Sequence, residues 1–225
     1  MSRPQALFVT GTDTGVGKTL VSLALMVRGR REGLTVLGLK PVASGCQRHT
    51  EGLVNADALR LSAESTVSLS YRRVNAYAFE PPIAPHLAAE LAGRLIDLVG
   101  LTASVQDACR LAELIVVEGV GGWEVPLAGQ QTLADLVRAL DLPVVLVVGM
   151  RIGCLNHAIL TAASILAHGC RLCGWVANTI DPAMLALEEN VRTLKARLPA
   201  PLLGHLPYCV SASPDALAPY LSLPS

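Results

Sequence analysis

The distribution of apolar residues constrains the fold more than any other feature of this sequence. Continuous apolar runs at 6–11, 35–40, 114–119, 143–149, 172–179 and 202–206 alternate with helical patterns at 17–32, 55–63, 84–92, 102–112, 132–140, 156–168 and 183–197. Strands that are apolar along their whole length are typical of parallel sheets with helices on both faces. The sequence therefore predicts a doubly wound α/β fold with a mostly parallel sheet. The segment 41–101 has the weakest periodicity, and we expect it to lie over the strand ends, where such folds bind ligands.

Size and charge narrow the class of protein. The 225 residues fit one domain, 1–225. Lysines and arginines number 18, as do aspartates and glutamates, so the net charge gives no attraction to nucleic acid or anionic lipid. The longest apolar runs, such as 142–150, reach about half the roughly 20 residues of a membrane-spanning helix, and no signal-peptide pattern is seen. We expect a cytoplasmic protein that has neither nucleic acid nor a membrane as a partner.

The cysteines and histidines do not form a metal or redox motif. Cys170 and Cys173 make one C-x-x-C, but there is no second pair and no histidine at metal spacing. The pair leads into an apolar strand, whereas a thioredoxin-like motif opens a helix. We therefore expect reduced and mostly buried thiols. No G-x-S-x-G is present, so a Ser-centred hydrolase is not indicated either.

A loop rich in glycine and threonine, "VTGTDTGVGKT" at 9–19, joins the first strand to the first helix. Backbone N–H groups in such a turn cradle phosphate oxygens, and the helix N-terminus adds partial positive charge. Lys18 is placed to reach the β- and γ-phosphates, and the Thr19 hydroxyl to bind Mg²⁺. This predicts a P-loop, and with it a P-loop NTPase-like form of the doubly wound fold. The loop is a variant, because Thr12 stands at the usual first glycine. Deviant-loop ATPases that depend on a partner carry a lysine where this sequence has Asp13.

Several polar residues follow apolar strands and are expected at the same sheet edge as the loop. Glu118 ends "LIVVE" and precedes glycines, the arrangement of a carboxylate that binds Mg²⁺ beside phosphates. Lys40 ends another strand, and the residues alone leave open whether it lies near the γ-phosphate or in solvent. Asp57, in "NADAL", is either a second metal carboxylate or an acid favoured at a helix N-terminus. Asn178 ends "GWVAN", where its amide reads a base edge or, as the pattern favours, caps a turn.

Taken together, these stretches resemble the dethiobiotin synthetase family, ATP-dependent enzymes of biotin synthesis. The matching segments occur in family order and span nearly the whole chain: "VTGTDTGVGKT" (9–19), "KPVASG" (40–45), "NADAL" (55–59), "VEGVGGW" (117–123), "LPVVLVVGMRIGCLNHA" (142–158), "GWVAN" (174–178) and "PAPLLGHLP" (199–207). Other P-loop enzymes share the G-T-D-T loop. "KPVASG" together with "GCLNHA" is far more specific.

The resemblance implies a reaction and its co-substrates. One amine of 7,8-diaminopelargonic acid takes up CO₂, the carbamate attacks the γ-phosphate of ATP, and the second amine closes the ring with release of phosphate. The cofactor implied is Mg²⁺, and the products are dethiobiotin, ADP and phosphate. A related P-loop amidotransferase-type synthetase is the first alternative, but the chain leaves no room for a glutaminase domain. A partner-regulated ATPase is the second, and Asp13 counts against it.

The resemblance also implies roles for individual residues. Lys40, Lys18 and Thr14 match catalytic positions, and Thr19, Asp57 and Glu118 match the metal site. Nucleotide-binding positions are Gly15, Val16, Gly17, Lys18, Thr19, Leu20, Asp57, Glu118, Gly119, Val120, Gly121, Asn178, Thr179, Pro207, Tyr208, Cys209 and Asp215. Gly15 stands where some members carry glutamate, so its contact is through the backbone alone. The stretch 207–217 differs from the family in length by one residue, and Asp215 is the residue it offers for a further nucleotide contact.

The stretch "RIGCLNHA" at 151–158 resembles the family loop whose backbone N–H groups hold the substrate carboxylate. Substrate-binding positions implied there are Gly153, Cys154, Leu155 and Asn156, with Ser44 on the other side of the site. In the family this loop belongs to the neighbouring subunit, so the resemblance implies a homodimer with shared sites. The residues themselves agree that 151–158 is a helix N-terminus, which suits a carboxylate.

Overall fold

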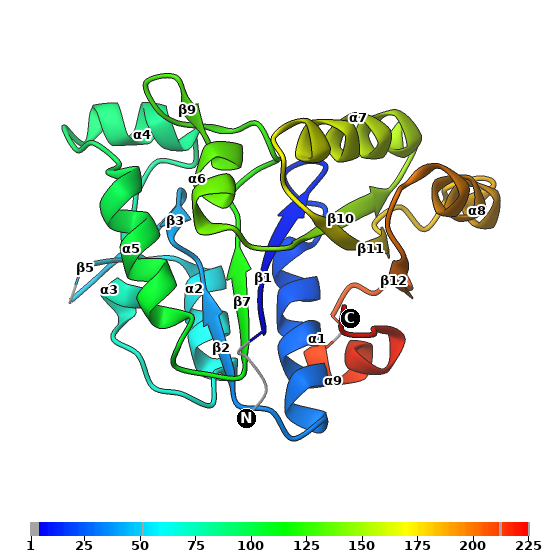
Figure 1. Ribbon diagram of the computed structural model, residues 1–225, viewed down its shortest axis with the longest axis horizontal. Helices are drawn as coiled ribbons and strands as arrows, with labels where there is room; N and C mark the ends of the chain where they lie inside the picture. The colour runs from blue at the N-terminus through cyan, green and yellow to red at the C-terminus, as the bar shows by residue number, and fades with distance from the viewer. Residues whose placement is uncertain (1–4, 51, 212, 225) are drawn as a thin grey trace.

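A six-stranded parallel sheet forms the centre of the computed structural model, which describes residues 5–50, 52–211 and 213–224. The strand order is β12-β11-β10-β1-β7-β2, and every neighbouring pair is parallel (Figure 1). The strands are β1 (Gln5–Gly11), β2 (Val36–Leu39), β7 (Leu114–Glu118), β10 (Val144–Met150), β11 (Leu172–Thr179) and β12 (Leu202–Leu206). The fold predicted from the alternation of apolar runs and helical patterns is therefore confirmed.

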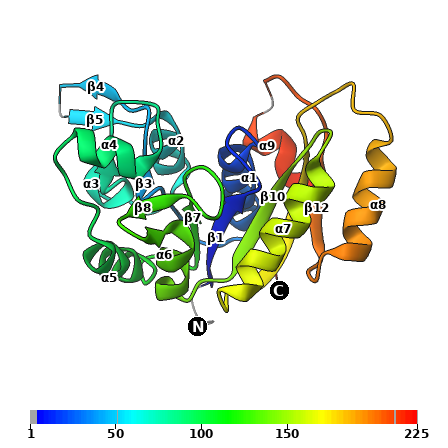
Figure 2. The same ribbon diagram turned by 90° about the horizontal axis from the view of Figure 1, so that it is seen from above.

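Helices cover both faces of this sheet, as Figure 2 shows in the view along it. One face packs on α1 (Lys18–Arg31), α2 (Ala56–Glu64) and α9 (Pro214–Leu217), and the other on α5 (Leu98–Ala108), α6 (Leu133–Leu140), α7 (Cys154–Ala167) and α8 (Leu187–Arg197). A hydrophobic core lies on each face of the sheet, and alternate residues of β1 point into the two cores. Leu7 and Val9 belong to the core on the α1 face, and Phe8 belongs to the core on the other face. Because both faces of the sheet are covered, its strands are mostly apolar, and β10 is buried at every position.

All six predicted strands are observed within a residue or two of their expected ends. Two helices are displaced by local capping. The helix expected at 102–112 begins at Leu98, because the Asp97 side chain accepts a hydrogen bond from Val99 N–H. The helix expected at 183–197 begins only at Leu187, after Ala186 in a left-handed conformation with φ of 54°.

Short elements that the sequence did not predict fill the connections. Within 41–101 they are the parallel pair β3 (Val42–Ala43) and β6 (Tyr77–Ala78), the hairpin β4 (Gln47–His49) and β5 (Gly52–Val54), and α3 (Tyr71–Val74). The predicted α4 (Pro85–Leu91) follows them. A second hairpin joins β8 (Pro126–Ala128) to β9 (Gln131–Thr132), and a 3₁₀ turn spans Ala218–Tyr220. Among the described residues, no helix is both long and apolar enough to cross a bilayer.

All six cysteines are free thiols, and four of them are buried. Cys109 is partly buried and Cys209 is exposed. The expectation of mostly buried thiols is confirmed.

Candidate functional site

The carboxyl ends of the parallel strands meet at one edge of the sheet, and a cleft of about 660 Å³ opens over the ends of β1, β2 and β7. Its lining includes eleven of the residues predicted from the sequence: Thr14, Gly15, Gly17, Lys18, Thr19, Lys40, Ser44, Asp57, Glu118, Val120 and Gly121. It also includes Asn55, Pro82, Ile83, Ala84, Pro85 and Val125, which the sequence did not single out. Residues far apart in the chain therefore form one site, and the expectation that part of 41–101 lies over the strand ends is confirmed.

The loop between β1 and α1 depends on glycine. Gly15 and Gly17 have φ of 75° and 91°, values that side-chain-bearing residues rarely adopt. A Cβ on Gly17 would lie 2.2 Å from Nδ2 of Asn178, so a larger residue would displace that amide. Gly17 caps α1 without a side-chain hydrogen bond to the first turn. The N–H groups at the start of α1 thus face the cleft as donors for an anion.

Lys18 opens α1 and folds back over the loop, where its Nζ donates to the carbonyl oxygen of Asp13 at 2.9 Å. The side chain is largely buried, at 8% exposure of the residue. Burial, followed by repulsion from Lys40, lowers the pKa of Lys18 to about 8. A buried ammonium with a lowered pKa is a group that an anionic ligand would stabilise.

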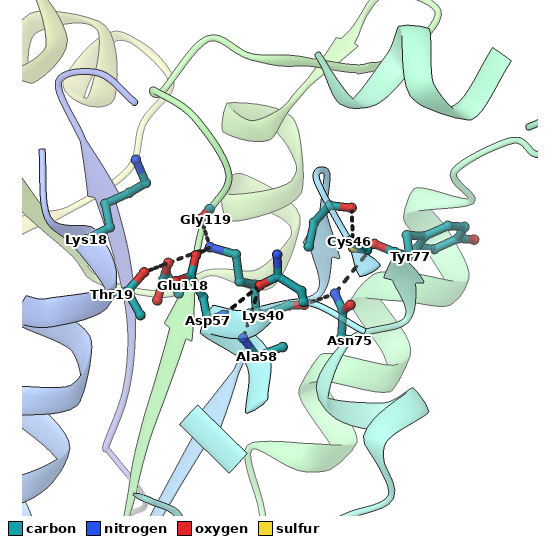
Figure 3. A network of polar contacts seen from close by, with 12 residues as sticks. Lys18, Thr19, Lys40, Cys46, Asp57, Ala58, Asn75, Tyr77, Glu118 and Gly119 are labelled. Atoms are coloured by element: carbon teal, nitrogen blue, oxygen red, sulfur yellow. Dashed lines mark hydrogen bonds and ion pairs between the residues drawn. The ribbon is translucent and has the colours of Figure 1, made fainter. Parts of the chain in front are cut away.

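Lys40 lines the cleft and lies between two carboxylates (Figure 3). Its Nζ is 2.5 Å from Glu118 Oε1 and 3.2 Å from Asp57 Oδ2. Burial alone would lower the pKa of Lys40, but Glu118 and Asp57 together outweigh it and raise that pKa. The ammonium is therefore charged, and the interpretation of Lys40 as a solvated strand-end residue is wrong.

A chain of hydrogen bonds fixes the backbone that carries Lys40. The Asn75 side-chain amide donates to the Lys40 carbonyl at 2.6 Å (Figure 3). The Tyr71 hydroxyl donates to Asn75 Oδ1 at 3.1 Å and accepts from Asn55 N–H at 2.7 Å. The Asn55 side chain in turn caps α2, the helix that presents Asp57. Tyr71 thus links the supports of the lysine and of one carboxylate, and no spacing pattern in the sequence pointed to it.

Three oxygen donors fit a magnesium ion that also binds phosphates. The Thr19 hydroxyl donates to Glu118 Oε1 at 2.8 Å, and Asp57 lies across Lys40 from this pair. Glu118 Oε2 is buried and has no hydrogen-bond partner in the part of the chain that the structure describes. Within the described residues, no group of three His, Cys, Asp or Glu side chains forms an all-protein metal cage. Mg²⁺ bound with a nucleotide does not need one, because one or two carboxylates plus phosphates and waters suffice.

Part of the cleft lining is apolar. Pro82, Ile83 and Val125 form this apolar wall and line the same cleft as the loop and the two lysines. Ser44 also lines the cleft, and its Oγ is buried with no hydrogen-bond partner among the described residues. The cleft thus combines a cationic end, an apolar side and a free hydroxyl, which suits an aliphatic ligand with a polar reacting end.

Several predicted nucleotide positions lie at or just after the ends of β11 and β12 and are not part of the cleft lining. Asn178 donates through Nδ2 to the Val16 carbonyl at 2.8 Å, so its amide braces the loop. Thr179 Oγ1 lies 2.9 Å from His205 Nε2. Pro207, Tyr208 and Cys209 follow β12 and are exposed. Val16 is buried in the core on the α1 face, and Leu20 packs against the same core. The carbonyl oxygen of Gly119 lies 3.4 Å from Lys40 Nζ.

Asp215 is not brought to this site. It lies in α9, where its backbone carbonyl accepts from Arg31 Nη2 at 3.0 Å. Arg31 ends α1, a 14-residue helix, so Asp215 is about 20 Å along that helix from Lys18. Like Pro207, Tyr208 and Cys209, Asp215 does not line the cleft, and its role as a nucleotide contact stays a prediction.

The segment 151–158 forms a helix N-terminus, as predicted. Gly153 has φ of 90° and precedes Cys154, the first residue of α7. Cys154 is buried, Leu155 partly buried, and Asn156 exposed. None of the four positions from 153 to 156 lines the cleft of the same chain.

The parallel sheet, the glycine-rich loop and the buried Lys18 place the chain among the P-loop nucleotide-binding α/β proteins. A family model described as "AAA domain" matches residues 5–215. Relatives named ATP-dependent dethiobiotin synthetase BioD include one from Pseudomonas paraeruginosa, 52% identical over 97% of this chain and 96% of its own, and one from Xanthomonas campestris, 51% identical over 97% and 98%. The chain therefore belongs to the ATP-dependent dethiobiotin synthetase family.

Solved structures add support for the fold alone. The signal recognition particle receptor FtsY from Elizabethkingia anophelis, in complex with GDP, matches with a TM-score of 0.54 and 15% identity. This match covers 96% of the chain but only 60% of FtsY. The MinC:MinD cell division protein complex of Aquifex aeolicus contains a chain that matches with a TM-score of 0.56 and 17% identity, over 92% of this chain and 82% of that one.

Proposed function

We propose that this chain converts 7,8-diaminopelargonic acid, CO₂ and ATP into dethiobiotin, ADP and phosphate. One observation carries the proposal: two buried lysines, Lys18 and Lys40, converge with Glu118 on one cleft beside a phosphate-type loop. Full-length relatives that are about half identical and named ATP-dependent dethiobiotin synthetase support the same reaction.

The reaction proceeds in three balanced steps. An amine nitrogen attacks CO₂ and loses a proton, which gives a carbamate. A carbamate oxygen then attacks the γ-phosphorus, the bond to the bridging oxygen breaks, and ADP leaves. The second amine attacks the carbonyl carbon of this mixed anhydride, the C–O bond to phosphate breaks, and phosphate and a proton leave as the ureido ring closes.

The second step brings two anions together, and the lysines address this repulsion. Two unit charges 4 Å apart interact by about 4 kcal/mol at an effective dielectric constant near 20. Lys18 holds the phosphate side, and Lys40 holds the γ-phosphate and the carbamate, since positive groups aimed at a transferring phosphoryl group stabilise its transition state. Thr14 orients the reacting end from the loop. Mg²⁺, when bound by Thr19, Asp57 and Glu118, supplies further charge neutralisation of the phosphates.

The remaining contacts follow the family pattern. Gly15, Val16, Gly17 and Leu20 hold the triphosphate with Lys18 and Thr19, and Gly119, Val120 and Gly121 close its other side. Asn178 and Thr179 with Pro207, Tyr208 and Cys209 surround the base. Ser44 contacts the diamine end, and the aliphatic chain lies along the apolar wall.

The substrate carboxylate binds the backbone N–H groups of Gly153, Cys154, Leu155 and Asn156 of a neighbouring subunit. The position of these residues at the start of α7 and outside their own cleft supports this arrangement. The protein is then a homodimer with shared sites. Its cytoplasmic location stays a prediction from the sequence.

Phosphate release from Mg-ATP and bicarbonate, with and without 7,8-diaminopelargonic acid, tests the proposal when mass spectrometry identifies the product. We expect phosphate and dethiobiotin in equal amounts, both dependent on the diamine. Diamine-independent hydrolysis stimulated by a protein would indicate a partner-regulated ATPase. Turnover with another acceptor alone would indicate a related P-loop synthetase.

A further inference from the structure

An ion pair joins the phosphate-type loop to the segment that precedes α7. Arg151 Nη2 lies 2.6 Å from Asp13 Oδ2, although the two residues are 138 positions apart in the chain. Their side chains are 43% and 46% exposed, so the contact lies at the rim of the site. Neither residue lines the cleft.

Asp13 is bound on several sides, and each contact affects the loop. One carboxylate oxygen accepts from Thr14 N–H at 2.7 Å, and the other is held by Arg151. The backbone carbonyl of the same residue accepts from Lys18 Nζ at 2.9 Å. Arg151 therefore fixes the one loop residue that contacts both the Thr14 amide and the Lys18 ammonium.

The position of Arg151 is not explained by the stability of α7. It stands three residues before Cys154, the first residue of that helix, where a cation opposes the helix dipole. Its carbonyl accepts from Cys154 N–H at 3.0 Å, so the residue also shapes the first turn. The ion pair between Arg151 and Asp13 therefore connects the glycine-rich loop to the start of α7.

We propose that Arg151 and Asp13 are positioning residues that link the triphosphate loop to the start of α7. Loss of either charge loosens the loop around Lys18 and, through Arg151, the segment 153–156. The second half of this link rests on the function proposed above, in which that segment holds the substrate carboxylate.

A double-mutant cycle on nucleotide affinity tests the first half without the diamine. The dissociation constant of a non-hydrolysable ATP analogue with Mg²⁺ is measured by calorimetry for wild type, Asp13→Asn, Arg151→Gln and the double variant. We expect each single variant to bind about two- to fivefold more weakly, typical of one partly exposed ion pair, and the double variant to bind no more weakly than either. Arg151→Lys retains the charge and should recover most of the affinity. Unchanged affinity in Arg151→Gln, or fully additive losses, would overturn the link.

A matched control exists in the same chain. Arg28 and Glu32 form an ion pair at 2.7 Å with exposures of 38% and 42%, at the far end of α1. Arg28→Gln removes a comparable contact and should leave nucleotide affinity unchanged. Thermal unfolding of all variants checks that they fold. If Arg151→Gln does not fold, the nucleotide affinities of Arg151→Lys and Asp13→Asn still test the link.

Steady-state kinetics test the second half. Arg151→Gln should raise the KM for 7,8-diaminopelargonic acid several-fold with a smaller change in kcat, and an unchanged KM would refute this part. The two proposals fail differently. If the wild-type protein makes no dethiobiotin, the proposed function is refuted. The nucleotide dissociation constants of the variants still test whether the ion pair positions the loop. A wild type that makes dethiobiotin while Arg151→Gln binds nucleotide normally refutes the link alone.

Discussion

Replacing Lys40 by methionine removes the ammonium between Glu118 and Asp57 and keeps most of the side-chain volume. The Lys40 and Glu118 side chains are 6% and 0% exposed, so the substitution leaves a carboxylate buried without its partner. Breaking a buried ion pair from one side costs about 3–5 kcal/mol. Asp57 is 38% exposed, and solvent screens its share, so it adds little to this figure.

This free energy can be converted into a melting temperature. A 225-residue chain has an unfolding entropy of about 0.5 kcal/mol per kelvin. Lys40→Met should therefore lower the Tm by roughly 6–11 °C, as measured by circular dichroism. Lys195→Met, an exposed position in α8, serves as the control and should leave the Tm nearly unchanged.

The cause of the loss can be separated from lost packing. In a Glu118→Gln background the buried charge is gone, so adding Lys40→Met should cost much less and can even restore stability. Turnover of the single variant should fall by roughly 10²–10³-fold, as expected when one group that stabilises transition-state charge is removed. A Tm within 2 °C of wild type, or an equal loss in both backgrounds, would refute the reasoning.

Three further substitutions or labels test other parts of the structure. Gly17→Ala should abolish measurable nucleotide binding in calorimetry, because its Cβ would lie 2.2 Å from a side-chain nitrogen. Gly33→Ala, at a similar φ of 84° with nothing within 4 Å, should bind normally. Tyr71→Phe removes the hydroxyl that bridges two asparagines and should cost about 1–3 kcal/mol in urea unfolding, with reduced turnover and unchanged nucleotide affinity. Burial raises the pKa of Cys109 to about 11, so its thiol stays neutral at pH 8 and becomes reactive only as the pH nears that value. Iodoacetamide followed by mass spectrometry should therefore find exposed Cys209 modified and Cys109 unmodified at pH 8.

The sequence predicted the central sheet because burial on both faces leaves an unmistakable pattern. A strand such as β10, buried at all seven positions, is apolar throughout, and its length and β-branched residues separate it from a helix. Helix ends were harder to predict because they depend on single residues. Asp97 starts α5 four positions early, and Ala186 delays α8, through conformations that have no periodic signal.

The residues of the site also fall into those that the sequence could predict and those that it could not. Lys18, Lys40 and Glu118 could be predicted because each stands at a strand end or a helix start, where a parallel fold gathers its ligands. Tyr71 and Asn75 could not, since they act on the backbone of Lys40 through contacts that depend on the path of 41–101. The Asp13–Arg151 pair also depends on tertiary structure, because only the adjacency of β1 and β10 brings its two residues together.

The strand register explains why Lys40 and Glu118 meet at all. Leu39 of β2 pairs with Val117 of β7, so the residue that follows each strand position, Lys40 or Glu118, arrives at the same level of the sheet edge. Glu118 in turn pairs with Val9 of β1, the strand that leads into the loop and α1, and this brings Thr19 within 2.8 Å of the same carboxylate. Backbone pairing therefore holds Lys40 and Glu118 together where two buried strands end. A shift of β2 by one residue would turn the lysine to the other face of the sheet. The pairing of Lys40 with Glu118 therefore depends on the same buried strands that form the centre of the sheet.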